Sequence, residues 1–164
     1  MLKITISMLL ITSLSSGYIY ANDNKVVLTI SGNISKYTDV SKKIYEFHES
    51  DIAKLKVYQI DTVTTWTAKS LFAGPLLRDV LVTVGAKGNS ITTLALDKYK
   101  YTIPMSDLSN YSVILANSIN GNKLTVATLG PFWVMYPLPT MKDDVKGLIL
   151  DAKLSWQVYK IVVN

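Results

Sequence analysis

The sequence contains no cysteine among its 164 residues. The chain therefore forms no disulfide, offers no thiolate to a metal and carries no lipid anchor on cysteine. His48 is the only histidine, which excludes a metal site built from two or more histidines. A serine triad would need His48 as its base, and the sequence has no serine-elbow motif, no GxGxxG and no P-loop.

Arginine and glutamate are also scarce. Arg78 is the only arginine among 17 basic residues, and Glu46 and Glu49 are the only glutamates. Proteins that bind nucleic acids rely on arginine for bidentate contacts to phosphate and guanine, whereas the lysines here are scattered. We therefore interpret the formal net charge of +5 as a charge that favours solubility, and expect no nucleic-acid partner.

The N-terminal segment has the pattern of a secretory signal peptide. A lysine at position 3 precedes an apolar run from Ile4 to Leu14, small residues follow, and Ala21 offers a cleavage site. The run is too short for a helix that spans a bilayer, which needs about 20 apolar residues. We expect residues 1–21 to be removed, with an uncleaved membrane anchor as the alternative. Residues 22–164 then form a single domain that does not span the membrane.

Short strands and few helices are expected in the mature chain, which indicates an α+β domain with a mixed β-sheet and short helices. Pro75 to Val84 is the clearest helix, because it has a single apolar stripe and Gly85 follows it. The other expected helical segments are 49–55 and 104–108, and the expected loops are 67–74 and 137–147. The expected strands are 26–31, 43–48, 57–65, 91–96, 100–103, 111–119, 132–136 and 156–163.

The remaining candidates for a binding site are aromatic and polar residues at loop–strand junctions. Trp66 stands among threonines, a setting that suits the polar edges of a flat ligand, although such aromatics can also fill a core. Arg78 lies just inside the expected helix and could instead pair with Asp79 on the surface. Asp97 and Asp107 could bind a ligand or cap a turn.

Four segments, taken together, resemble the oxidoreductase molybdopterin-binding domain, which has the sulfite oxidase fold. Residues 72–81 read F-A-G-P-L-L-R-D-V-L, similar to the family's W-x-G-V-P-L-R-D-L-L. Residues 95–108 and 111–121 resemble its next two blocks, and residues 130–137 read G-P-F-W-V-M-Y-P, similar to G-P-x-R-L-V-x-P. The four segments keep the family's order and spacing, and the resemblance runs from about Thr64 to Val163, most of the mature chain.

The best match within this superfamily is to small exported pterin-binding proteins of the PruR type. The resemblance implies a sulfite-oxidase-like fold and a periplasmic protein that binds a reduced, metal-free pterin. It also implies a sensory role without catalysis, exerted on the periplasmic domain of a membrane-bound cyclic-di-GMP enzyme. The ligand-binding residues that we expect are Thr65, Trp66, Phe72, Arg78, Asp107, Tyr136 and Trp156.

Two departures from the superfamily pattern shape these expectations. The metal-binding cysteine of the oxidoreductases falls in the stretch Thr62 to Trp66, where this chain has none, so we expect neither molybdenum nor oxidoreductase activity. A basic residue commonly precedes the G-P-x-W strand, where Ala127 to Leu129 stand here, which favours a pterin without phosphate. The alternatives are a ligand-free interaction module of the same fold and a subunit of a molybdenum oxidoreductase.

Overall fold

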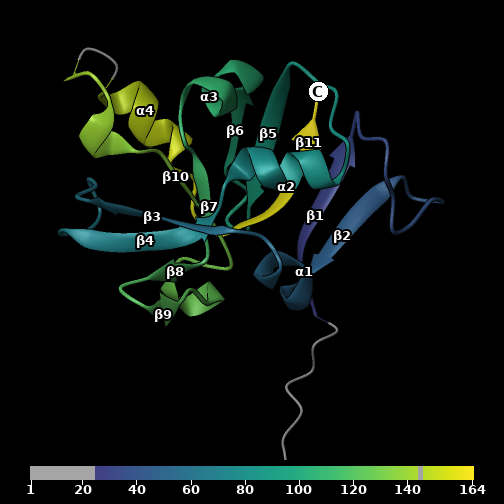
Figure 1. Ribbon diagram of the computed structural model, residues 1–164, viewed down its shortest axis with the longest axis horizontal. Coiled ribbons are helices and arrows are strands. Elements are labelled where there is room, and N and C mark those ends of the chain that lie inside the picture. The colour runs from purple at the N-terminus through teal and green to yellow at the C-terminus, as the bar shows by residue number, and fades with distance from the viewer. Residues whose placement is uncertain (1–24, 144–145) are drawn as a thin grey trace, which may run out of the picture.

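The computed structural model describes residues 25–143 and 146–164 of the chain (Figure 1). The expected signal peptide, residues 1–21, lies outside the described residues. Within them, no helix is long and apolar enough to cross a membrane.

A five-stranded sheet joins the two ends of the described chain. Its order is β2-β1-β11-β5-β6. β1 and β11 are parallel, and every other pair is antiparallel. The five strands are β1 Val26–Gly32, β2 Ile44–His48, β5 Ser90–Ala95, β6 Lys100–Pro104 and β11 Val158–Val163. Strand β5 alternates half-buried and buried residues, as expected for a strand with one face on the core.

A second group of short strands supports the candidate site. It consists of a four-stranded sheet, β3-β4-β8-β9, and an antiparallel pair, β10-β7. The strands are β3 Val57–Thr62, β4 Ser70–Pro75, β7 Ile114–Ala116, β8 Ser118–Ile119, β9 Asn122–Lys123 and β10 Trp133–Met135. The single strand expected over 111–119 is thus divided into β7 and β8, which pair with different partners.

The expected loop at residues 67–74 is wrong, because most of it belongs to β4. β4 pairs with β3 along its whole length and with β8 on its other side, so it is an interior strand. Gly74, which we interpreted as a loop residue, instead allows close packing: a Cβ there would collide with the backbone of Leu115 and Ala116. Pro75 ends β4 rather than opening the helix.

The helices are short and lie outside the sheets. α1 covers Glu49–Ala53, α2 Leu77–Thr83, α3 Met105–Asn110 and α4 Leu148–Lys153, with 3-10 turns at Val126–Thr128 and Leu138–Thr140. The apolar stripe of α2 is buried as expected, and Gly85 ends the helix with a φ of +63°. α4 had no counterpart among the expected elements.

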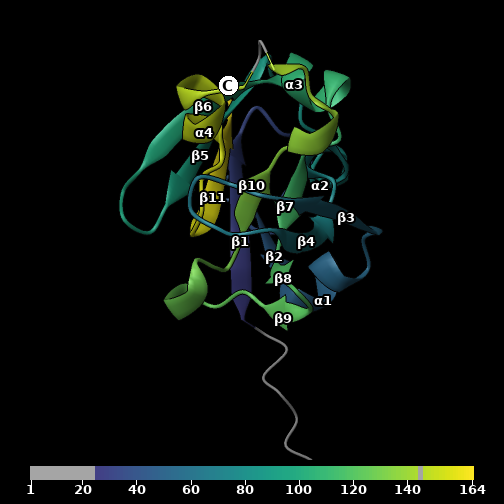
Figure 2. The same cartoon turned by 90° about the vertical axis from the view of Figure 1, so that its left-hand side faces the viewer.

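A single apolar core unites the sheets and the helices. It includes the whole of β7 and β10, which are buried on both faces. In Figures 1 and 2, α3 and α4 lie at one end of the molecule, and β8 and β9 lie at the other end. The result is a mixed α+β domain made mostly of sheet, as the sequence predicts.

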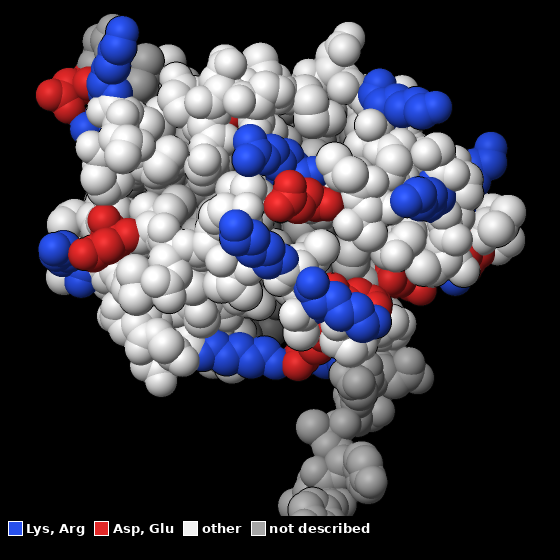
Figure 3. Space-filling model, viewed as in Figure 1, with Lys and Arg blue, Asp and Glu red and all other residues white. Residues whose placement is uncertain are grey.

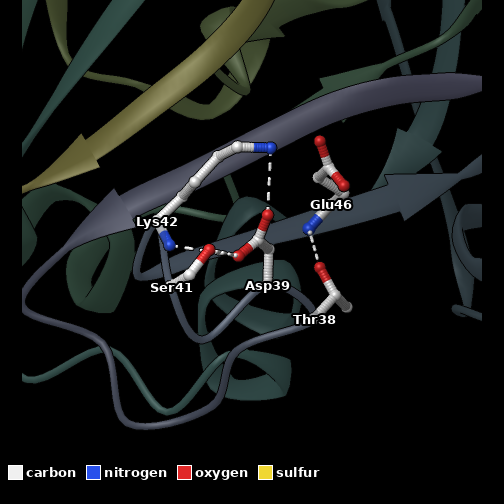
Figure 4. A network of polar contacts seen from close by, with 5 residues as sticks. All are labelled: Thr38, Asp39, Ser41, Lys42 and Glu46. Carbon is white, nitrogen blue, oxygen red and sulfur yellow. Dashed lines mark hydrogen bonds and ion pairs between the residues drawn. The ribbon is translucent and has the colours of Figure 1, made fainter.

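The connection between β1 and β2 is held by a polar turn centred on Asp39 (Figure 4). Its carboxylate accepts hydrogen bonds from the Ser41 hydroxyl at 2.7 Å and the Lys42 backbone N–H at 3.0 Å. The Lys42 ammonium lies 3.0 Å from the same carboxylate. These contacts, the Ser41 hydrogen bond foremost, hold the pKa of Asp39 well below its ordinary value.

Charged side chains are spread over the surface. On the face seen in Figure 3, most acidic residues lie beside basic ones, several basic side chains at the upper right stand apart from acidic residues, and no continuous basic patch forms. Most ion pairs among the described residues are well exposed, Lys69–Asp61 and Lys54–Asp51 among them. Such exposed pairs contribute little to the free energy of unfolding.

Candidate functional site

A hollow of about 370 Å³ opens where three parts of the chain meet. Its walls come from the loop after β3, the turn between β5 and β6, and the segment from α4 to the start of β11. The volume falls within the range of small-molecule sites. The residues that line it are Thr65, Trp66, Asp97, Tyr99, Leu148, Asp151, Ala152, Leu154, Ser155 and Trp156.

The threonine-rich loop after β3 fixes Trp66 at the mouth of this hollow. The Thr64 hydroxyl accepts hydrogen bonds from the backbone N–H groups of Trp66 at 3.1 Å and Thr67 at 3.0 Å. Such local side-chain bonds to the backbone shape a tight turn without glycine or proline. The indole of Trp66 remains 44% exposed, so it is a large aromatic surface held in place at the entrance.

An aromatic cluster continues from Trp66 into the core. The rings of Trp66 and Trp156 meet edge to face, with centroids 4.8 Å apart. Trp133 lies behind Trp156 at 5.8 Å, and its indole N–H donates to the Leu154 carbonyl at 2.9 Å. Phe72 packs against Trp133 and is fully buried. Phe72, expected to bind the ligand, is therefore a core residue that supports the cluster, and it does not line the hollow.

Helix α4 forms the opposite wall and is tied to both other walls. The Thr65 hydroxyl donates to the Asp151 carboxylate at 2.8 Å, which joins α4 to the threonine loop. The Tyr99 hydroxyl donates to the Ala152 carbonyl at 2.9 Å, which joins α4 to the β5–β6 turn. In that turn Asp97 accepts the Tyr99 backbone N–H at 2.8 Å.

Asp107 and Tyr136 lie together but outside the lining of the hollow. The buried Tyr136 hydroxyl donates to Asp107 at 2.7 Å, and the Lys153 ammonium reaches the same carboxylate oxygen at 2.6 Å. Burial, followed by the hydrogen bond to Asp107, raises the pKa of the Tyr136 phenol far above its ordinary value. Since Lys153 belongs to α4, this trio anchors α4 to α3, which contains Asp107.

Arg78 lies away from the hollow on the exposed side of α2. Its guanidinium is 3.9 Å from the neighbouring Asp79, with both side chains well exposed. This position matches the surface pairing that the sequence left open. Arg78 does not meet the other expected ligand-binding residues.

The residues in the Thr62–Trp66 stretch do not fit a molybdenum centre. In the oxidoreductases that the motifs resemble, a cysteine thiolate binds molybdenum, and this sequence has no cysteine. The Thr62 hydroxyl donates to the Val63 carbonyl, and the Thr64 hydroxyl is engaged in the turn around Trp66. Within residues 25–143 and 146–164, no group of three or more metal-binding side chains occurs either.

A second, larger hollow of about 820 Å³ lies between α1, β9 and the start of β1. None of the expected ligand-binding residues lines it. We therefore place the candidate site in the smaller hollow, where Thr65, Trp66 and Trp156 converge from segments far apart in the sequence.

The sequence missed the contributions of α4 and of the β5–β6 turn apart from Asp97. Asp151 lies on a helix that no expectation covered, and Tyr99 was noted only as part of a motif. The sequence held one weak signal for α4: the apolar residues Leu150 and Leu154 are four positions apart and follow Gly147. In the structure Leu150 lies within α4 and Leu154 caps its C-terminal end, and both are buried.

Comparison with known proteins supports the fold. No protein-family model matches the chain, and no curated protein matches its sequence. The solved structure of the sulfane dehydrogenase SoxCD from Paracoccus pantotrophus is similar, with a TM-score of 0.61 and 16% sequence identity over 90% of this chain. The match covers 40% of the SoxCD chain, so this protein corresponds to less than half of that enzyme. The similarity shows that the two chains share a fold over this region.

Proposed function

We propose that this chain is a periplasmic pterin-binding protein with a sulfite-oxidase-like fold and that it has no catalytic activity of its own. The observation that carries the proposal is the hollow at Trp66, which combines a large, fixed aromatic surface with carboxylates and hydroxyls on the facing walls. Flat heteroaromatic ligands need this combination, because the ring stacks while its edges form hydrogen bonds.

The polar groups suit the edge of a pterin. The aminopyrimidinone edge of that ring presents parallel N–H donors, which a single carboxylate can accept together. Asp97 and Asp151 both line the hollow, each with one protein hydrogen bond, and are the candidates for this role, whereas Asp107 lies outside the lining and holds Tyr136 and Lys153. No lysine or arginine is found among the described lining residues, which agrees with a pterin that lacks phosphate.

A substitution of Trp66 tests the proposal. Stacking of a base on an aromatic side chain is worth about 1–3 kcal/mol, so Trp66→Ala should weaken binding of tetrahydrobiopterin at least about fivefold in anaerobic calorimetry. Trp66→Phe keeps an aromatic face and should retain much of the affinity. Leu96→Ala, at a side chain that is also 44% exposed but lines the second hollow, is the control. Equal affinity in Trp66→Ala and the parent would remove Trp66 from the site.

We further propose that the ligand-bound protein regulates a membrane-bound cyclic-di-GMP enzyme through that enzyme's periplasmic domain. This part rests on the resemblance to the small exported pterin-binding proteins. Deletion of the gene in its native host should change the cellular cyclic-di-GMP level, and restoring the Trp66→Ala variant should not reverse the change. An unchanged level in the deletion strain would contradict this part while leaving ligand binding intact.

A ligand-free interaction module is the second candidate function. Leu148 and Ile149 on α4 favour it, because they are 88% and 73% exposed. Leu148 also lines the hollow, so a contact surface there would include its rim. Apolar side chains exposed together indicate a contact surface for another protein. Failure of the purified protein to bind any reduced pterin would favour this candidate over the first.

A further inference from the structure

The charge of the hollow is opposite to that of the protein. The chain has 17 basic and 12 acidic residues, yet the charged residues among the described lining are two aspartates, Asp97 and Asp151. The two negative charges make the local charge of the hollow opposite to the net charge of the chain. Asp97 comes from the β5–β6 turn and Asp151 from α4, more than fifty positions apart in the sequence.

Each carboxylate uses one oxygen to hold the protein together. The Thr65 hydroxyl occupies Oδ2 of Asp151, and the Tyr99 backbone N–H occupies Oδ1 of Asp97. The other oxygen of each carboxylate has no hydrogen-bond or ion-pair partner within residues 25–143 and 146–164. Each aspartate therefore has a fixed orientation and a remaining acceptor for a ligand.

The hydroxyl groups of Thr65 and Tyr99 at the mouth of the hollow add to its negative character. Thr65 donates its proton to Asp151, and Tyr99 donates its proton to the Ala152 carbonyl, so both hydroxyl oxygens are left as acceptors. The faces of aromatic rings carry negative potential, and Trp66 presents 44% of its surface at the entrance. Carboxylates, hydroxyl lone pairs and an aromatic face all favour a positively charged ring over a neutral or anionic one.

We propose that this hollow selects flat heteroaromatic ligands by charge, that it prefers cations, and that Asp97 and Asp151 determine this preference. The inference rests on the proposed function only in taking the hollow as the ligand site. It adds a selectivity that a pterin-binding role alone does not require. Among ligands of one ring size, affinity should fall in the order cation, neutral molecule, anion.

Three two-ring probes of matched size test the proposal: N-methylquinolinium, quinoline and quinoline-2-carboxylate. Calorimetry on the mature protein, residues 22–164, at pH 7.5 and low salt should give about tenfold tighter binding of the cation than of quinoline, with the anion weakest. Added salt should weaken binding of the cation and leave quinoline nearly unchanged. Equal affinities, a tighter anion, or no binding of any probe would overturn the proposal.

The variant Asp97→Asn/Asp151→Asn supplies the matched control. Asparagine keeps an oxygen for the Tyr99 N–H and the Thr65 hydroxyl, so the turn and the attachment of α4 should survive, as an unchanged thermal unfolding curve would show. The double variant should lose the preference for the cation and keep its affinity for quinoline within about twofold. Retained charge preference would overturn the assignment to these two residues.

The experiments can contradict the pterin-binding proposal and the charge-selection proposal independently of each other. If tetrahydrobiopterin does not bind but the charge order of the three probes holds, the pterin function is wrong and the charge selection stands. If tetrahydrobiopterin binds and the probes show no charge order, the selectivity is wrong and the pterin function stands.

Discussion

Removal of the Tyr136 hydroxyl tests the account of how α4 is held in place. Tyr136 is fully buried, and its hydroxyl donates to Asp107 at 2.7 Å. Hydrogen bonds to charged groups contribute about 1.5–3 kcal/mol. In Tyr136→Phe the Asp107 carboxylate keeps the Lys153 ammonium at 2.6 Å, so it is not left without a partner. We therefore expect the lower end of that range, about 1.5 kcal/mol of lost stability.

Urea denaturation measures this loss. The midpoint should fall while the slope with denaturant concentration stays the same, because the surface exposed on unfolding is unchanged. Tyr159→Phe is the control, since that ring is 39% exposed on β11 and its hydroxyl forms no hydrogen bond in the described part of the chain. A Tyr136→Phe protein as stable as the parent would refute the claim that this hydrogen bond stabilises the fold.

We also expect Tyr136→Phe to change how the free energy of unfolding depends on pH under alkaline conditions. The pKa of the Tyr136 phenol is raised in the folded state, first by burial and then by the Asp107 hydrogen bond. An unfolded chain would ionise this tyrosine near its ordinary pKa of 10, whereas the folded chain keeps it neutral. The stabilisation is therefore fully present below about pH 10 and falls as the pH rises above it, by up to about 1.4 kcal/mol per pH unit. Tyr136→Phe should show a shallower alkaline decline than the parent, and identical slopes would contradict the burial of this group.

Two further substitutions test the fold. Gly74→Ala should destabilise the protein by about 3 kcal/mol or prevent folding, because the added Cβ meets the rigid backbone of Leu115 and Ala116. A thermal unfolding temperature equal to that of the parent would refute the close packing of β4 and β7. Asp39→Asn should make the free energy of unfolding less dependent on pH at the acidic end. The pKa of Asp39 is lowered in the folded state, so this carboxylate contributes stability above its ordinary pKa near 3.8, and that stability is lost as the pH falls below it. Acid titrations of both proteins followed by circular dichroism measure this difference, and superimposable curves would contradict the role given to the Asp39 turn.

The sequence was informative where one element has one local pattern. Four strands of the five-stranded sheet, β1, β2, β5 and β6, were expected within a residue or two of their bounds, and the buried stripe of α2 was confirmed. These elements repeat a single period of apolar residues, which local sequence reports directly. The α+β class followed from their number and order.

The sequence was misleading where long-range packing decides the local structure. β4 contains Gly74 and ends at Pro75, residues that usually mark loops, yet it pairs with β3 on one side and β8 on the other. The missing side chain of Gly74 lets the backbone of β7 pack closely against β4. The short helix α4 forms through contacts with distant partners at Thr65, Tyr99 and Asp107. No local pattern specifies such partners, since propensity is a weak guide for a helix this short.

The candidate site was predicted only in part, because long-range packing also decides which residues meet there. Thr65, Trp66 and Trp156 were expected and lie together at one hollow. Phe72 was expected to line the pocket but lies in the core behind it. The sequence around an aromatic residue near Gly74 is the same whether the ring lines a pocket or supports it. Asp151 could be assigned only after α4 was seen to face the threonine loop.

The most direct test of the central claim is a chemical analysis of the protein from its native source. The protein would be purified from its native host, denatured, and its released small molecules examined by fluorescence and mass spectrometry. The account predicts a released pterin in near-equal amount to the protein, with much less from Trp66→Ala. A protein that releases no pterin and also binds no added reduced pterin would contradict the claim.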